Sequence, residues 1–438
     1  MSTLNDVVIT KLSGGLGRRN PEQDMVSGLL FDGVATTKLA LNKIERLASL
    51  EDAEALGITA DYDVNGQSAF YQIQQFFRMN PSGDLYIMVT TGTSYEEIAG
   101  KAMDMQEKAN GNIRQMAIIY SGATTFAQTQ AAVLKAQTEA GLAYKDYMPF
   151  EIILEGKGFT VDAPSLDGSN AENVSVVVAM DVEKAFEKKL FQKDNLKLYI
   201  LAPNEEVLPV EGSLDVYNVR NADGLKKENG AVLEFVFKNS YKNTAAVGLA
   251  LGAISKAKVS ENIAWIEKFN LTGEGFAKAG FVGGEEIKTL GTLGDLNEKR
   301  FIFARTHTGL PGVYFNDSAT CTTGTSDFAY VENNRTINKA TRLLRTALLP
   351  KLASPVLVDI DGKLPQSVSK SFEGLCRSAL EGMVANQEVS AFDVYVDPKQ
   401  NILATSELKV KAEITPIGTA RKIMVDLGFK NPFGIDKA

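Results

Sequence analysis

Residues 326–364 read SDFAYVENNRTINKATRLLRTALLPKLASPVLVDIDGKL, and the stretch that they open, which runs to Lys430, decides the fold. At about 100° per residue, the run from Asn334 to Leu349 separates into a basic face and an apolar face, which predicts an amphipathic helix. Pro350 marks its expected end, because a proline clashes with the helical turn before it. The run PVLVDID, residues 355–361, then predicts a short buried strand.

The rest of this stretch predicts a second helix followed by two strands. Residues 365–385 place Val368, Phe372, Leu375, Cys376, Ala379 and Met383 on one helical face. Residues 408–414 and 420–429 alternate between apolar and polar side chains, which is typical of strands. The last strand carries its apolar side chains on one face: Ile423, Val425, Leu427 and Phe429.

The basic face of the first helix consists of Arg335, Lys339, Arg342 and Arg345, which we call the basic stripe. A helix face in water usually carries acidic residues four positions from its basic ones, and this stripe has none. Two interpretations stay open. The stripe is either a solvated helix face or a contact for an acidic partner surface.

Upstream, the chain alternates between helix and strand patterns, which predicts an α/β layer with a largely parallel sheet. Helices are expected at 39–56, 67–79, 94–109, 125–140 and 244–258, and strands at 25–31, 85–90, 116–120, 150–154, 174–180, 196–201, 232–237, 301–305 and 312–315. Residues 157–173 are expected to form an exposed loop, and residues 273–298 are irregular.

Composition restricts the class of protein. The chain has 438 residues, 44% hydrophobic and 23% charged, as in an ordinary folded protein of two or more domains. No window reaches 18 apolar residues, and the start lacks a basic and apolar signal region, so we expect synthesis in a cytoplasm without membrane insertion. A net charge of −8 argues against nucleic acid as the main partner. Cys321 and Cys376 are expected to be buried free thiols.

Three patterns resemble catalytic or binding motifs. The run LSGGLGRR, residues 12–19, resembles the phosphate loop of sugar nucleotidyltransferases, but Arg18 replaces their threonine and the lysine that follows there is absent; a flexible hinge is the simpler interpretation. Asp359 and Asp361 could hold Mg²⁺, although D-x-D-G sequences also form ordinary turns. His307 is the single histidine, and its spacing from Cys321 indicates no catalytic pair.

A family resemblance rests on the closing stretch. Its elements are residues 317–320 and 326–328, the Arg335-x-Ile337-x-Lys339 run, Asp359-x-Asp361-Gly362 and the two closing strands. Together they resemble the C-terminal domain of contractile tail sheath proteins, which form the outer cylinder of contractile phage tails and bacterial injection machines. The resemblance covers about the last 130 residues and, weakly, the first 20.

The resemblance implies an assembly protein rather than an enzyme, with no cofactor. It implies six-fold rings stacked helically around an inner tube protein, baseplate and terminal cap proteins as further partners, and a place in a virion tail or injection particle made in the bacterial cytoplasm. Nucleic acid and membrane are not expected partners. The enzyme alternative is a nucleotidyltransferase-like α/β protein that uses the GGLGRR loop.

We expect an α/β fold in four parts. Residues 1–20 form an N-terminal strand arm, residues 21–300 an outward α/β lobe, residues 301–415 a sheath-type domain of two helices and a mixed sheet, and residues 416–438 a C-terminal strand arm. Both arms, through Val7 and Ile9 and through Ile423, Val425, Leu427 and Phe429, are expected to add strands to sheets of neighbouring subunits. Pairing of the two arms within one subunit is the alternative. We also predict that the basic stripe faces the inner tube in the extended state, because screened charge contacts can release as the sheath expands.

Overall fold

The computed structural model describes residues 23–63, 67–182, 189–193, 196–200, 225–228, 231–234 and 241–429. The N-terminal arm with Val7 and Ile9, and the GGLGRR loop, lie outside these residues. The chain divides into two compact units, residues 1–346 and 347–438. The first unit continues past the predicted boundary at residue 300, because Phe301, Ile302 and Phe315 belong to its hydrophobic core.

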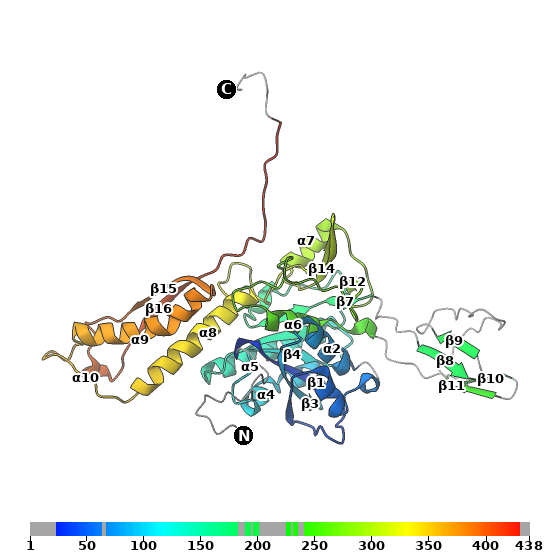
Figure 1. The fold of residues 1–438 in the computed structure, drawn as a ribbon, viewed down its shortest axis with the longest axis horizontal. Coiled ribbons are helices and arrows are strands. Elements are labelled where there is room, and N and C mark those ends of the chain that lie inside the picture. Colours follow the sequence, from blue (N-terminus) through cyan, green and yellow to red (C-terminus); the bar gives the residue numbers. More distant parts are fainter. Residues whose placement is uncertain are drawn as a thin grey trace, which may run out of the picture. The chain divides into compact units, whose positions relative to one another are not determined.

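A six-stranded sheet forms the centre of the first unit (Figure 1). Its order is β2-β3-β1-β4-β5-β6, and all neighbouring pairs are parallel except β2 with β3. The strands are β1 (Val26–Asp32), β2 (Ile44–Leu47), β3 (Asp84–Thr90), β4 (Gln115–Ile119), β5 (Glu151–Glu155) and β6 (Val174–Val177). β4 and β5 are buried at every residue, as expected for strands that are covered on both faces.

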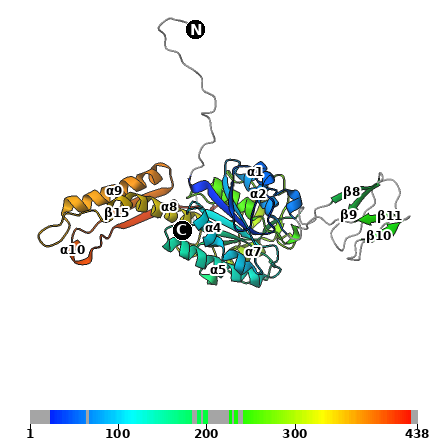
Figure 2. The same ribbon diagram turned by 90° about the horizontal axis from the view of Figure 1, so that it is seen from below.

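Helices in two groups cover this sheet (Figure 2). One group is α2 (Ala69–Met79) with α6 (Val247–Lys256); the other is α3 (Tyr95–Ala99), α4 (Ala102–Lys108) and α5 (Phe126–Lys145). α2 and α6 approach closely: a Cβ atom at Gly248 would lie 2.1 Å from the carbonyl oxygen of Gln72. Gln72 in turn donates to the carbonyl of Ala245 and accepts from the amide of Gly248, each at 2.7 Å. Only glycine therefore fits at this crossing.

Shorter elements complete the first unit. β7 (Ala179–Asp181) pairs with β12 (Ala279–Phe281), and β13 (Ala304–His307) with β14 (Leu310–Phe315), both antiparallel. Two further antiparallel pairs are β8 (Lys189–Lys193) with β9 (Leu196–Ile200) and β10 (Leu225–Glu228) with β11 (Ala231–Glu234). Helices α1 (Leu50–Ala55), α7 (Leu290–Glu298) and most of α8 (Val331–Leu348) also belong here.

The second unit combines one long helix with one hairpin. α9 (Gln366–Ala385) packs on β15 (Val389–Tyr395), which pairs antiparallel with β16 (Lys411–Pro416). The short helix α10 (Ile402–Thr405) lies in the connection between the two strands. Residues 417–429 follow β16 and belong to no helix or strand.

The α/β class is confirmed, but four predictions about local elements are wrong. The helix expected at 39–56 is strand β2 followed by α1, because β2 pairs with the sheet edge and Ser49 caps a new helix. The strand expected at 355–361 is extended chain with Leu357 and Ile360 exposed. The irregular stretch 273–298 contains β12 and α7, and the helix expected at 94–109 is broken between α3 and α4.

Candidate assembly surfaces

Polar side chains in the first half of α8 are buried, whereas the leucines in its second half are half-exposed. Glu332, Asn334, Arg335 and Asn338 are at most 5% exposed, whereas Leu343, Leu344 and Leu348 are of intermediate burial. The reason is that the α/β unit offers polar partners. Asn334 donates to the carbonyl of Glu172 at 2.6 Å, and Asn338 donates to Oε1 of Glu151 at 2.9 Å.

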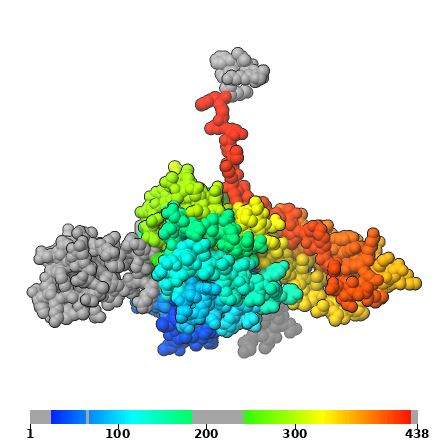
Figure 3. Space-filling view, turned by 180° about the vertical axis from the view of Figure 1, so that it is seen from behind, coloured from blue at the N-terminus to red at the C-terminus, as the bar shows by residue number. Residues whose placement is uncertain are grey.

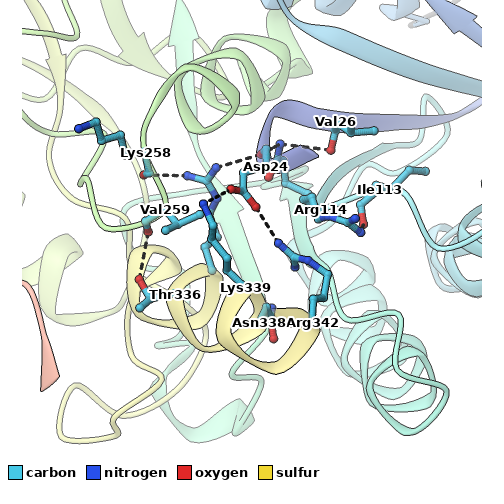
Figure 4. Close-up of polar contacts among 12 residues, drawn as sticks. Asp24, Val26, Ile113, Arg114, Lys258, Val259, Thr336, Asn338, Lys339 and Arg342 are labelled. Carbon is cyan, nitrogen blue, oxygen red and sulfur yellow. Dashed lines mark hydrogen bonds and ion pairs between the residues drawn. The ribbon is translucent and has the colours of Figure 1, made fainter. Parts of the chain in front are cut away.

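Three side chains of the basic stripe converge on one residue, Asp24 (Figure 4). Asp24 lies just before the central strand β1. Its carboxylate oxygens lie 2.6 Å from Nζ of Lys339 and 2.7 Å from Nη2 of Arg342. Arg335 donates to the carbonyl of Asp24 at 3.1 Å and to the carbonyls of Ala257 and Lys258 at 3.2 Å, at the C-terminal end of α6. We call these four side chains the Asp24 cluster.

Electrostatics hold the Asp24 cluster in its charged form. Burial opposes ionisation of Asp24, but the hydrogen bond from Lys339 and the charges of Lys339, Arg342 and Arg335 outweigh it and lower the pKa of that carboxyl. Burial lowers the pKa of Arg335 to about 10, still far above neutrality. The cluster therefore keeps its charges at pH 7. Its ion pairs hold α8 against the start of β1, and it does not act as an acid or a base.

The basic stripe lies largely against other parts of the first unit rather than in solvent. Arg335 is 4% exposed, and the Lys339 and Arg342 side chains are 17% and 18% exposed. Arg345 stacks on the ring of Tyr147, with 3.6 Å from its guanidinium carbon to the ring centroid. The stripe has no acidic residue four positions away on its own helix because its acidic partner is Asp24, which lies 318 positions before Arg342. Contact of the stripe with a tube remains a prediction.

Glu151, at the start of β5, is a buried carboxyl beside the Asp24 cluster. Its Oε1 accepts from Asn173 at 3.0 Å and from Asn338, while no partner is found for Oε2 within the described residues. Burial raises the pKa of Glu151 to about 8, despite the hydrogen bonds from the asparagines and the charge of Arg335. Glu151 is therefore mostly protonated at neutral pH.

In the second unit, α9 reaches the outer edge of β15. Arg377 donates to the carbonyl of Val394 at 2.8 Å and pairs with Asp393 at 2.5 Å. Glu373 accepts the amide of Val396 at 3.0 Å. Side chains from the helix thus occupy hydrogen-bonding groups along the free side of this strand.

The C-terminal arm is extended and exposed. Ile423, Val425, Leu427 and Phe429 are between 78% and 108% exposed, and residues 417–429 are drawn as a single chain in red in Figure 3. Large apolar side chains at such exposure are unfavourable in water, at about 25 cal/mol per Å² of apolar surface. The arm therefore has the alternating apolar residues of a buried strand, but these side chains are exposed in the single chain.

The candidate catalytic and metal-binding residues take structural roles. The Asp359 carboxylate accepts the amides of Asp361 and Lys363, and Gly362 has a φ of 74°, which confirms the turn interpretation. His307 lies in the β13–β14 hairpin beside Arg305 and Tyr314. Cys321 and Cys376 are buried free thiols. Within the residues that the structure describes, no cluster of metal-ligating side chains occurs and no helix is long and apolar enough to cross a membrane.

Sequence reasoning missed Asp24, Glu151, Glu373 and Arg377. Asp24 and Glu151 carry no local signal, because their partners on α8 lie more than 180 residues away. Glu373 and Arg377 could have been found, since they are four residues apart and lie on the polar flank of the predicted second helix.

Family models match almost the whole chain. The DUF2586 N-terminal domain matches residues 4–319 and the DUF2586 C-terminal domain matches residues 327–434. The chain belongs to the DUF2586 family. No curated protein sequence matches it.

Among solved structures, the DUF2586 chain shares its fold with sheath proteins. It matches the contracted helical sheath of the anti-feeding prophage with a TM-score of 0.59 at 12% identity, covering 98% of this chain and 100% of that one. A chain of the anti-feeding prophage baseplate matches at 0.57 and 12%, with the same coverage. The contracted PVC sheath of an extracellular contractile injection system matches at 0.56 and 10%, covering 98% of both chains. The predicted sheath fold is confirmed over the full chain.

Proposed function

We propose that this chain is the subunit of a contractile sheath, which polymerises helically around an inner tube and contracts to drive that tube through a target envelope. The observation that carries the proposal is the likeness in fold to sheath subunits over 98% of the chain. The exposed apolar C-terminal arm supports it, because an assembly subunit can bury such a strand only in a neighbour.

In this proposal both terminal arms add strands to sheets in neighbouring subunits. Backbone hydrogen bonds supply strength, and alternating side chains fix the register. Rings of six, the tube, the baseplate and a terminal cap are the proposed partners, and the α/β unit faces away from the tube. The work of contraction comes from the difference in free energy between the subunit interfaces of the extended sheath and those of the contracted sheath, and no nucleotide is consumed. The nucleotidyltransferase-like alternative has no support from the comparisons.

Electron microscopy of the purified chain, alone and co-expressed with a candidate inner tube protein, tests the function. We expect long tubes or stacked rings, with co-expression favouring an extended form around the tube. Discrete particles under both conditions, together with a rise in melting temperature on adding nucleoside triphosphate and Mg²⁺, would instead indicate the enzyme.

A further inference from the structure

Arg114, which directly precedes the central strand β4, is a buried cation held only by backbone groups. It is 8% exposed. Its Nη1 donates to the carbonyl of Gly111 at 2.6 Å and to that of Ile113 at 3.5 Å, while its Nε has no hydrogen bond within the described residues. Buried arginines are almost always paired with an acid, so the surroundings of this one are unusual.

A second guanidinium, that of Arg342 on α8, lies near Arg114 (Figure 4). Burial and, next in size, the positive charge of Arg342 lower the pKa of Arg114 to about 10, against a smaller opposing effect of Asp24. The Arg342 side chain is 18% exposed, and its Nη2 lies 2.7 Å from Oδ1 of Asp24. In the part of the chain that the structure describes, its Nε and Nη1 have no hydrogen bond. The two arginines therefore repel each other across a region where both have N–H groups to spare.

Two buried carboxyl groups lie near these cations, and only one of them is charged. Asp24 is ionised, but Arg342 shares it with Arg335. Glu151 is held against Arg114 by a backbone hydrogen bond of 3.0 Å, and burial raises the pKa of its carboxyl to about 8. At pH 7 three guanidiniums therefore surround one charged carboxylate, in a region with little water to screen them.

We propose that Arg114 and Arg342 form a binding site for a small tetrahedral oxyanion of the inorganic phosphate class. A guanidinium presents its N–H groups as a planar fork that fits two oxygens of a phosphate. Nε of Arg114 and the Nε and Nη1 of Arg342 are the donors. A free anion is favoured over a carboxylate on another protein, because both side chains are mostly buried and because phosphate carries more negative charge than one carboxylate.

A bound oxyanion would connect α8 to β4. The amide of Arg114 donates to the carbonyl of Val26 at 2.9 Å, and its carbonyl accepts the amide of Glu151 at 3.0 Å, so its backbone is fixed in the central sheet. Arg342 belongs to α8, which the Asp24 cluster already joins to the start of β1. The anion would add a second connection and remove the repulsion between the two arginines. The stability of the first unit should therefore depend on phosphate.

Thermal melting of the full chain at neutral pH tests this dependence. Sodium phosphate is increased while sodium chloride keeps the ionic strength constant, so that general screening is the same in every sample. An anion that binds only the folded chain should raise the melting temperature by roughly 2–4 °C at about ten times its dissociation constant. Equilibrium dialysis of the same preparation against radiolabelled phosphate should show saturable binding. Absence of saturable binding would overturn the proposal.

Arg114→Met distinguishes an anion site from a purely structural arginine. Methionine fills similar space and removes the charge, and with it the repulsion from Arg342, so we expect little loss in melting temperature without phosphate. Phosphate should no longer raise the melting temperature of this variant. The matched control is Arg305→Met, which removes another partly buried arginine of the first unit, beside His307, and should keep the full rise.

Arg342→Met provides the same test from the side of α8. This variant also loses the ion pair with Asp24, so its melting temperature without phosphate should be lower, but phosphate should again have no effect. A full phosphate-dependent rise in Arg114→Met or Arg342→Met, or its loss in Arg305→Met, would refute the assignment of the site. All of these measurements use the soluble chain, so their outcome is independent of whether it forms a sheath.

Discussion

Glu151 shows how one buried carboxyl makes stability depend on pH. Its folded pKa is about 8 and its model value is 4.5, so between these values the folded chain keeps a proton that the unfolded chain releases. The free energy of unfolding therefore falls as pH rises through this window, by up to about 1.4 kcal/mol per pH unit. Below pH 4.5 both states are protonated and the group has no effect.

Substitution Glu151→Gln should remove this dependence. Glutamine keeps an acceptor for Asn173 and Asn338 and stays neutral at all pH values. We expect the loss in free energy of unfolding between pH 6 and pH 8.5 to be smaller in the variant by roughly 1–3 kcal/mol. Urea titrations of both proteins at the two pH values measure it. Because Glu155, with its pKa near 7, is present in both proteins, it cancels in the comparison. Equal losses would mean that Glu151 is already ionised at pH 6.

At the scale of elements, α8 and the start of β1 are joined by the Asp24 cluster. The proposed N-terminal arm ends just before Asp24, so a pull on that arm would reach α8 directly through Lys339 and Arg342. α8 in turn runs from the first unit into the second. The cluster therefore connects the residues that follow the N-terminal arm to α8, the helix that continues into the unit with the C-terminal arm.

The substitution Asp24→Asn should weaken the contact between α8 and the start of β1. We expect a loss of about 1–3 kcal/mol in free energy of unfolding at pH 7, since three cations lose their shared anion, and faster hydrogen exchange in η1 (Gln23–Met25) and the start of β1. The low pKa of Asp24 means that its contribution is present above pH 4 and is lost as pH falls through the folded value. The control is Asp104→Asn, whose exposed pair with Lys108 is worth less than about 0.5 kcal/mol. Equal losses in free energy of unfolding from the two substitutions would contradict a stabilising role of the Asp24 cluster.

The sequence predicts those elements whose pattern is local. α5, β4, β5 and α9 follow the predicted ranges closely, because each combines a clear apolar period with a capping residue or turn nearby. The burial of the first half of α8 could not be predicted in the same way, because apolar periodicity assumes that polar side chains meet water. Here they meet Glu151, Asp24 and three backbone carbonyls from distant parts of the chain. No pattern within one helix contains that information.

At the scale of the whole molecule, the C-terminal arm carries a run of large apolar side chains that the single chain leaves exposed. Its sequence already predicted a strand with one apolar face, and the structure leaves that face exposed. Removal of residues 419–438 should therefore cost the monomer little. Within the described part of this segment, residues 419–429, no side chain belongs to the hydrophobic core, and we expect an unchanged melting temperature within about 2 °C. Assembly should be lost, because the strand that links copies is gone.

Two matched triple variants distinguish the effect of the strand's apolar face from the effect of having a strand there at all. Ile423→Asn, Val425→Asn and Leu427→Asn together alter the face that would be buried, whereas Lys422→Asn, Met424→Asn and Asp426→Asn alter the opposite face of the same strand. If the arm adds to a sheet in a neighbouring subunit, the first set should abolish polymers seen by electron microscopy and the second should leave them largely intact, since alternate side chains point to opposite faces. Sedimentation would show both as folded monomers before assembly. Normal tubes from the truncated chain, or equal loss with both sets, would rule out strand exchange through this arm.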